Sequence, residues 1–307
     1  MNITDIISVG LFAAAIRMAT PVALAALGGI FSERVGVVNV GLEGQMLMGA
    51  FSGVLVCYYT SNPWLGVISS IIIGGLLGMI HAFLSVTLRG NQIVSGTGIN
   101  ILALGFTAFS SEVVWGSRGA SASVNSLGVI DLPILSNIPI IGDILGSHSP
   151  LVYLMMIVVI LTQILLFKTP IGLRLRAVGE HPAAADTAGI NVIRMKYMGI
   201  IASGMLAGMG GVFLSLGNLS LFSYGMTGGR GFIALAAMIF GGWTPLGAFG
   251  ASLLFGFTDA LQMRLQSLGI LPPQIVLMLP YVITVIVLAG IVGKTKPPSD
   301  YKPYEKD

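Results

Sequence analysis

Five polar side chains interrupt apolar stretches of this sequence, far apart along the chain. They are Asn39, Glu43, Asn100, Arg230 and Asp259. Charged and strongly polar side chains are expensive in hydrocarbon, so they usually pair, bond backbone groups or face a water-filled path. Amides and carboxylates in such a path can exchange hydrogen bonds with a neutral polar solute. We therefore predict that these five residues line a substrate pathway.

Each of the five also has a structural alternative, which the sequence leaves open. Glu43 could instead bond free backbone N–H groups at the tip of a re-entrant turn, and Asn39 could cap a broken helix. Asn100 could bond a neighbouring helix, as amides in hydrocarbon do. Arg230 could neutralise a carbonyl-rich helix end or help to gate the passage, and Asp259 requires a partner or water.

Four other polar residues are expected to have structural roles. Glu33 and Arg34 are predicted to lie at the inner membrane interface, with a positional role. Arg17 and His81 are predicted to be satisfied by neighbouring groups, so neither is expected to bind the solute.

The sequence has no set of residues for catalysis or for binding a metal. It has no HExxH motif, a single cysteine, and three histidines in different predicted compartments. Leu288–Thr295 nearly matches the phosphate-binding loop GxxxxGK[ST], but it lacks the first glycine and the following helix that phosphate binding needs. We therefore predict no enzymatic activity, no metal and no cofactor in this chain.

The composition places the chain in a membrane. Of its 307 residues, 55% are hydrophobic and 9% are charged, whereas soluble domains carry about 25% charged residues. The expected fold is an all-α integral membrane protein, a polytopic helical bundle of about eight to ten transmembrane segments without a cleavable signal peptide. The net charge of +3 does not indicate nucleic-acid binding, because the basic residues mark topology.

The hydrophobic segments include two unusual ones. The predicted segments are Ile6–Ile30, Leu42–Tyr59, Trp64–Leu88, Val94–Trp115, Leu151–Phe167, Tyr197–Leu216, Phe232–Gly242, Leu246–Leu265 and Ile275–Val292. Gly28–Ala50 carries polar residues close to apolar runs, and Gly225–Gly247 is rich in glycine with a core too short to span. Both are predicted to be broken or re-entrant helices. Their similar places in the two halves suggest an inverted repeat, as in many transporters.

The distribution of charge predicts the orientation. Lys168–Lys196 holds five basic and two acidic residues, and the tail from Lys294 holds four lysines and three acidic residues. By the positive-inside rule both are cytoplasmic, and the loop Gly116–Pro150 is extracytoplasmic. We therefore divide the chain into a transmembrane permease domain, 1–293, which includes a cytoplasmic loop at 168–196, and a cytoplasmic tail, 294–307.

The cytoplasmic loop contains signals for a short helix. Pro182 suits the first position of a helix, the three alanines after it are strong helix formers, and Gly189 can adopt the left-handed conformation that ends one. A helix of about two turns is not stable alone. It must therefore be held by the adjacent spans or by a soluble partner at the inner face.

Three stretches resemble one family. GLRLRAVGEHPAAADTAGINVIRMKYMGIIASGMLAGMGG, residues 172–211, resembles the coupling loop of bacterial ABC importer permeases of the branched-chain amino acid and ribose type. FSERVGVVNVGLEGQMLMGA, residues 31–50, and NQIVSGTGINILALGFT, residues 91–107, resemble the nucleoside branch. Sugar-annotated relatives share the first of these two patterns.

The resemblance implies a function, partners and site residues. It implies a multi-pass permease subunit in the bacterial cytoplasmic membrane that imports nucleosides by alternating access. The implied partners are a second homologous permease, giving a heterodimer, two ABC ATPase subunits that use ATP and Mg²⁺, and an extracytoplasmic solute-binding lipoprotein. The implied ATPase-coupling residues are Gly179, Glu180, Pro182, Asp186 and Gly189. Glu180 could instead be a solvated surface charge.

Other transporter classes stay open. The solute could be a simple sugar or a branched-chain amino acid in the same kind of ABC importer. An ion-coupled secondary transporter would also use broken helices and polar groups near the midplane, but it would not need a capped cytoplasmic helix.

Overall fold

A computed structural model describes residues 9–131 and 141–268, with isolated positions between 274 and 298. The elements are α2 (Val9–Arg34), α3 (Leu42–Thr60), α4 (Pro63–Ala82), the π-helix η1 (Phe83–Thr87), α5 (Gln92–Trp115), β1 (Ile130–Asp131), α7 (Ile141–Leu145), β2 (Ser147–His148), α8 (Pro150–Lys168), α9 (Pro170–Glu180), α10 (Pro182–Thr187), α11 (Val192–Val212), the π-helix η2 (Phe213–Leu219), α12 (Arg230–Phe240) and α13 (Pro245–Leu268). Two residues of β1 pair antiparallel with β2.

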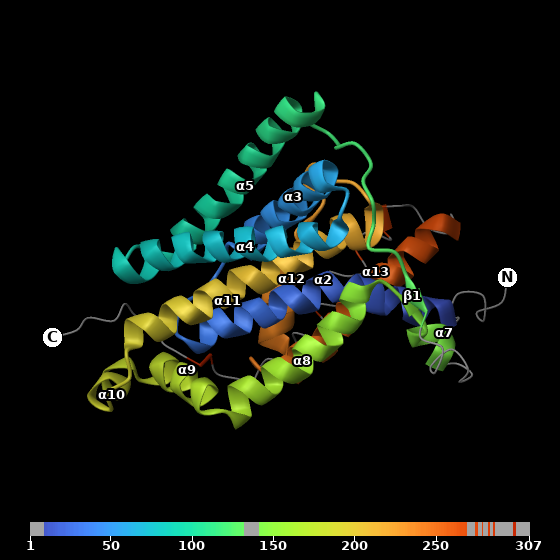
Figure 1. Ribbon diagram of the computed structural model, residues 1–307. Coiled ribbons are helices and arrows are strands. Elements are labelled where there is room, and N and C mark those ends of the chain that lie inside the picture. The colour runs from blue at the N-terminus through green and yellow to red at the C-terminus, as the bar shows by residue number, and fades with distance from the viewer. Residues whose placement is uncertain are drawn as a thin grey trace.

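The predicted all-α polytopic fold is confirmed. The predicted segments from the first through Leu246–Leu265 each coincide with a described helix, and Ile275–Val292 lies outside the described residues. Among the described residues, 5 helices are long and apolar enough to cross a membrane: α2, α4 with η1, α5, α8, and α11 with η2. α9 and α10 lie at one end of the bundle and α7 and β1 at the other (Figure 1), so the two predicted loops occupy opposite ends.

Asparagines start three of the helices. Asn62, Asn91 and Asn191 each accept a hydrogen bond from backbone N–H groups in the first turn of α4, α5 and α11. These side chains satisfy donors that have no partner inside a helix. The local sequence therefore sets where these helices begin.

α4 and α11 contact each other at glycines, and the two helices share a sequence pattern. A Cβ atom on Gly74 or on Gly204 would collide with the other residue's carbonyl oxygen, and one on Gly78 would lie 2.6 Å from the Ile200 oxygen. Small residues allow such close helix packing in membranes. Gly74-x3-Gly78 in α4 corresponds to Gly204-x3-Gly208 in α11, and Phe-Leu-Ser opens the π-helix after each. The contacts run antiparallel, which is local support for the inverted repeat predicted above.

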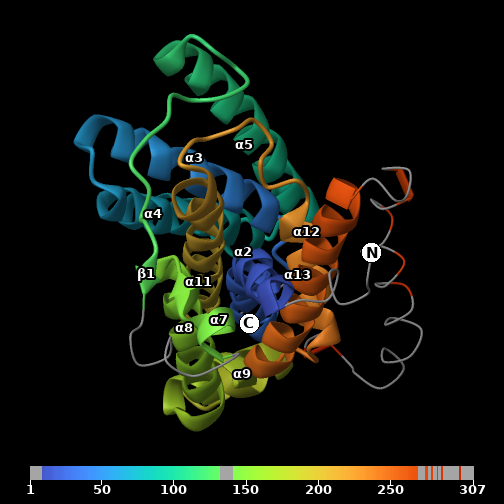
Figure 2. The same cartoon turned by 90° about the vertical axis from the view of Figure 1, so that its right-hand side faces the viewer.

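α5 leans away from the other helices (Figures 1 and 2). Its buried residues include Gly96, Asn100, Ala103 and Thr107, which recur at helical spacing on one side. The rest of its surface carries exposed apolar side chains: Ile93, Val94, Ile101, Leu102, Phe106, Phe109 and Val113. α5 is thus attached along a single face.

Candidate functional site

The break between α2 and α3 is held by side chains from surrounding helices. Gln92 Oε1 accepts a hydrogen bond from the Val38 N–H at 2.8 Å, and His81 Nε2 lies 3.0 Å from the Val38 carbonyl oxygen. Ser32 Oγ donates to the Val37 carbonyl at 2.6 Å. Non-helical backbone at membrane depth is tolerated only where such partners replace water. His81 is therefore satisfied by its neighbours, as the sequence predicted.

Asn39 is fully buried within this break. Its Nδ2 donates to Gln45 Oε1 and to Ser203 Oγ, both at 2.9 Å, and its Oδ1 accepts from the Gly41 N–H at 3.1 Å. The side chain thereby fixes the start of α3 and ties it to α11. Its polar atoms are used by the protein itself.

Asn100 connects α5 to the start of α3. Its Oδ1 accepts from the Gly44 N–H at 2.7 Å, and its Nδ2 donates to the Val40 carbonyl at 3.0 Å. A Cβ atom on Gly44 would lie 2.9 Å from the Asn100 Cα, so glycine is needed for this approach. Asn100 therefore satisfies one of the N–H groups in the first turn of α3, which have no helical partner.

Glu43 connects the start of α3 to the start of α12. Its Oε1 accepts from Thr227 Oγ1 at 2.6 Å and from the Gly229 N–H at 2.8 Å, and its Oε2 accepts from the Gly231 N–H at 2.7 Å. A carboxylate is favourable at a helix N-terminus because the free N–H groups and the helix dipole are both positive there. A Cβ atom on Gly231 would collide with the Glu43 backbone nitrogen. α3 and the shorter α12 thus meet at their N-terminal ends through one side chain.

Arg230 lies beside this meeting point, as the first residue of α12. Its Nη1 donates to the carbonyls of Thr227 at 3.2 Å and Met226 at 3.4 Å. Asp259 lies on α13 and is partly buried.

The structure therefore brings four of the five predicted pathway residues, Asn39, Glu43, Asn100 and Arg230, to the starts of α3 and α12, although they come from three helices or their flanks. Three of them (Asn39, Glu43 and Asn100) bond backbone or neighbouring side chains, as their structural alternatives describe. Sequence analysis missed Thr227 and Ser203, which are partners of Glu43 and Asn39. Serine and threonine are common in membrane helices, and no local pattern distinguishes these two.

A second polar junction lies where α2 ends. Arg34 donates from Nε at 3.1 Å and from Nη2 at 2.8 Å to the Trp243 carbonyl oxygen, between α12 and α13. Trp243 Nε1 donates to Glu33 Oε2. The guanidinium carbons of Arg34 and Arg176 lie 5.4 and 4.9 Å from the centroid of the Phe167 ring. These hydrogen bonds hold the end of α2 against the turn between α12 and α13, which is a positional role of the kind predicted for Glu33 and Arg34.

The predicted coupling residues occupy the C-terminal end of α9, α10 and the turn that follows. Gly179 is buried against the backbone of Arg34, whereas Glu180 is exposed. Pro182 is the first residue of α10, Asp186 lies within this helix, and Gly189 follows it with φ +80°. The predicted short helix is present, and it is anchored by the buried cluster of Val178, Ala185 and Val192. Its contact with an ATPase remains a prediction.

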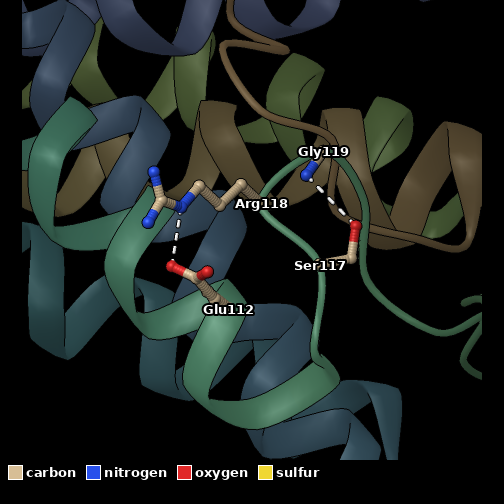
Figure 3. Close-up of polar contacts among 4 residues, drawn as sticks. All are labelled: Glu112, Ser117, Arg118 and Gly119. Atoms are coloured by element: carbon tan, nitrogen blue, oxygen red, sulfur yellow. Dashed lines mark hydrogen bonds and ion pairs between the residues drawn. The ribbon is translucent and has the colours of Figure 1, made fainter.

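The opposite end of the protein carries an exposed ion pair (Figure 3). Arg118 Nε donates to Glu112 Oε2 at 2.6 Å, and the two side chains are 73% and 46% exposed. Gly116 ends α5 in the left-handed conformation with φ +69°. The following strand-like segment bonds the loop after η2 through Ser121 N–H to Phe222 O and Val124 N–H to Ser220 O.

No group of three or more metal-binding side chains occurs within the described ranges.

Comparisons with known proteins assign the family. Residues 11–288 match the family described as the permease component of branched-chain amino acid transport systems. The chain is 41% identical to the guanosine ABC transporter permease protein NupQ of Bacillus subtilis, covering 97% of this chain and 96% of the relative. It is 42% identical to the nucleoside ABC transporter permease protein NupC of Lactococcus lactis, with the same coverage.

A third relative carries a different name. The chain is 36% identical to the putative glucose ABC transporter permease protein TsgC13 of Haloferax volcanii, covering 94% of this chain and 93% of the relative. No solved structure shows a significant match. The family match and the apolar helices together show that this chain is a multi-pass membrane protein, a transport subunit without enzymatic activity, and that it belongs to the family of permease components of branched-chain amino acid transport systems.

Proposed function

We propose that the chain is the membrane-spanning permease subunit of an ATP-driven ABC importer that takes up nucleosides. The observation that carries this proposal is the full-length identity of 41% and 42% to two permeases named for guanosine and nucleoside transport. The location is the bacterial cytoplasmic membrane, which the family and the apolar helices support.

The proposed energy source lies in another chain. ATP and Mg²⁺ are bound by two partner ATPase subunits, and this chain supplies the surface that receives their movement. The exposed side of α9 and α10 suits that role, because Glu180 is exposed and Pro182, Asp186 and Gly189 shape a helix that protrudes from the bundle. Alternating access follows if displacement of α10 moves the packed helices behind it.

The proposed translocation path lies between two permease subunits. α5 contacts the rest of the protein along one face, and its other faces expose many apolar side chains. Large exposed apolar surfaces mark contacts with lipid or protein. A second homologous permease facing α5 would place the region of Asn39, Glu43, Asn100, Arg230 and Asp259 near the middle of the path. We propose that Asn39, Glu43 and Asn100 shape the path through their bonds to the protein, and that Asp259 and the part of the Arg230 guanidinium beyond Nη1 contact the passing solute.

The experiment is reconstitution of the complete importer in proteoliposomes. Radiolabelled guanosine uptake should require ATP inside, a solute-binding lipoprotein outside and an intact ATPase. A complex whose ATPase carries a substituted phosphate-binding lysine is the matched control, and its uptake should be lost.

Other outcomes would select the alternatives. Uptake that persists with the inactive ATPase and collapses with the ion gradient would contradict the proposal in favour of a secondary transporter. Competition by excess glucose but not by nucleosides would indicate that the solute is a sugar. Glucose is the second candidate because of the name of the third relative.

A further inference from the structure

The turn between α12 and α13 adopts an unusual backbone conformation. Gly242 and Trp243 have φ values of +60° and +53°. The left-handed region is uncommon for a bulky residue such as tryptophan, so surrounding contacts must maintain it. Those contacts come from the end of α2: Arg34 binds the Trp243 carbonyl twice, and Glu33 accepts its indole N–H. Trp243 is 6% exposed and Glu33 is 5% exposed.

The same end of α2 contacts α9 directly. A Cβ atom on Gly179 would collide with the Arg34 carbonyl oxygen and would lie 3.3 Å from the Gly36 nitrogen. Backbone therefore touches backbone, one residue before Glu180 and three before α10 begins at Pro182. The guanidinium groups of Arg176, in α9, and Arg34 both lie over the Phe167 ring. Movement of α9 and α10 relative to α2 would require this packing to change.

α12 connects Trp243 to the polar centre of the protein. It contains 11 residues, a length of about 16 Å at the usual rise per residue. Its C-terminal end leads into the turn that Arg34 holds, and its N-terminal end donates the Gly231 N–H to Glu43. A displacement at the turn can thus reach the start of α3 through one short, hydrogen-bonded helix.

We propose that Arg34 and Trp243 form a joint through which displacement of α9 and α10 moves α12 and, through Glu43, the break before α3. Both are positioning residues and neither contacts the solute. The proposal rests on the proposed function, since it assigns a route to the movement that an ATPase would deliver. Its specific content is that α9 and α12 move together because the end of α2 binds both.

The test measures nucleoside uptake per ATP hydrolysed by the complete importer in proteoliposomes. Arg34→Met keeps the length of the side chain but removes both donors to Trp243, and uptake per ATP should fall about tenfold, since hydrogen bonds from charged groups are worth that factor or more. Trp243→Phe removes only the indole donor, so its fall should be smaller. Arg34→Lys should restore part of the ratio, because an ammonium group can still donate to the carbonyl.

The control is Trp64→Phe, which changes an indole that is 50% exposed at the opposite end and should leave the ratio unchanged. A role in folding alone would lower uptake and ATP hydrolysis together as less complex assembles, and the ratio would stay constant. If the Arg34→Met importer keeps the wild-type uptake per ATP hydrolysed, the proposed joint is therefore wrong. If the wild-type importer itself shows no ATP-dependent uptake, the proposed function fails, and the joint falls with it.

A second measurement covers variants that fail to assemble. Spin labels at Leu173 on α9 and Phe232 on α12, which are 60% and 49% exposed, report the distance between these helices in an otherwise wild-type complex. Pulsed EPR should give the same distance before and after ATP is added, because the joint keeps the helices together. A distance that changes with ATP would overturn the proposal without any substitution in the joint.

Discussion

Two glutamates at different places in this protein show what a half-buried carboxylate between helices does that an exposed one does not. Glu43 accepts two backbone N–H groups and one hydroxyl at 2.6 to 2.8 Å, where two helices begin. Glu112 bonds Arg118 at 2.6 Å, but both side chains are largely exposed. The formal ion pair is the exposed one (Figure 3). The number of hydrogen bonds in a half-buried site, rather than opposite charge, should therefore decide which carboxylate stabilises the fold.

Glu43→Ala should have the largest effect. It leaves three donors without their acceptor in a half-buried region, and a buried donor without an acceptor costs about 1 to 3 kcal/mol. We expect a loss of about 3 kcal/mol or more in the free energy of unfolding and loss of transport. Thermal unfolding of the purified protein in detergent measures it.

The matched control for this prediction is Glu43→Gln. It keeps one acceptor oxygen and nearly the same shape, so it should lie between wild type and Glu43→Ala. A Glu43→Ala protein as stable as wild type would show that Glu43 is not what joins α3 to α12.

Asn100→Ala should have the next largest effect. The substitution removes a donor to Val40 and an acceptor for Gly44, and we expect a loss of about 2 kcal/mol. Asn91→Ala, which removes the exposed cap of the same helix, should cost about 1 kcal/mol. Equal unfolding temperatures for the two variants would contradict the distinction drawn from burial.

The end of the protein that carries α7 and β2 offers a buried histidine for a further test of the comparison. His148 is buried, and its Nε2 lies 2.7 Å from the Ile144 carbonyl oxygen. Burial lowers the pKa of His148 below its ordinary value of 6.5. Below about pH 6.5 the unfolded chain therefore takes up a proton that the folded chain does not. Stability from this group is present above pH 6.5 and is lost as pH falls toward the lowered pKa.

Unfolding temperatures measured between pH 7.5 and 5 check this dependence. The part due to His148 should disappear in His148→Gln. Arg118→Gln changes an exposed side chain at the same end and gives the control, because it should keep the full dependence. An unchanged slope in His148→Gln would exclude this histidine as its source.

Arg118→Gln should have the smallest effect. Exposed ion pairs are screened by water and salt, and their contribution is offset by the ordering of two side chains. We expect an unfolding temperature within experimental error of wild type at physiological salt, with Glu112→Gln behaving alike. A clear loss of stability in both variants would contradict the comparison with Glu43.

Much of the fold could be predicted from the sequence. Asn62, Asn91 and Asn191 mark helix starts, and Pro182 and Gly189 bound the short helix α10. These features depend on contacts within a few residues, so local composition reveals them. The polar candidates were also visible, because a charge inside an apolar run is conspicuous.

What those polar residues bind could not be predicted. Glu43 meets Gly229 and Gly231, about 190 residues later in the chain, and Asn39 meets Ser203. The sequence around Arg34 gives no indication that its side chain donates to the Trp243 carbonyl. Each of these contacts depends on how separate helices pack.

The sequence by itself determined that this chain is a helical membrane protein with two broken segments and a capped short helix, because hydropathy and helix caps act over short distances. Only the tertiary structure decided that the two broken segments meet through Glu43 and that the end of α2 touches both α9 and the turn after α12. The physical reason is that backbone groups freed by a break in a membrane must find partners, and those partners come from helices that only folding brings near.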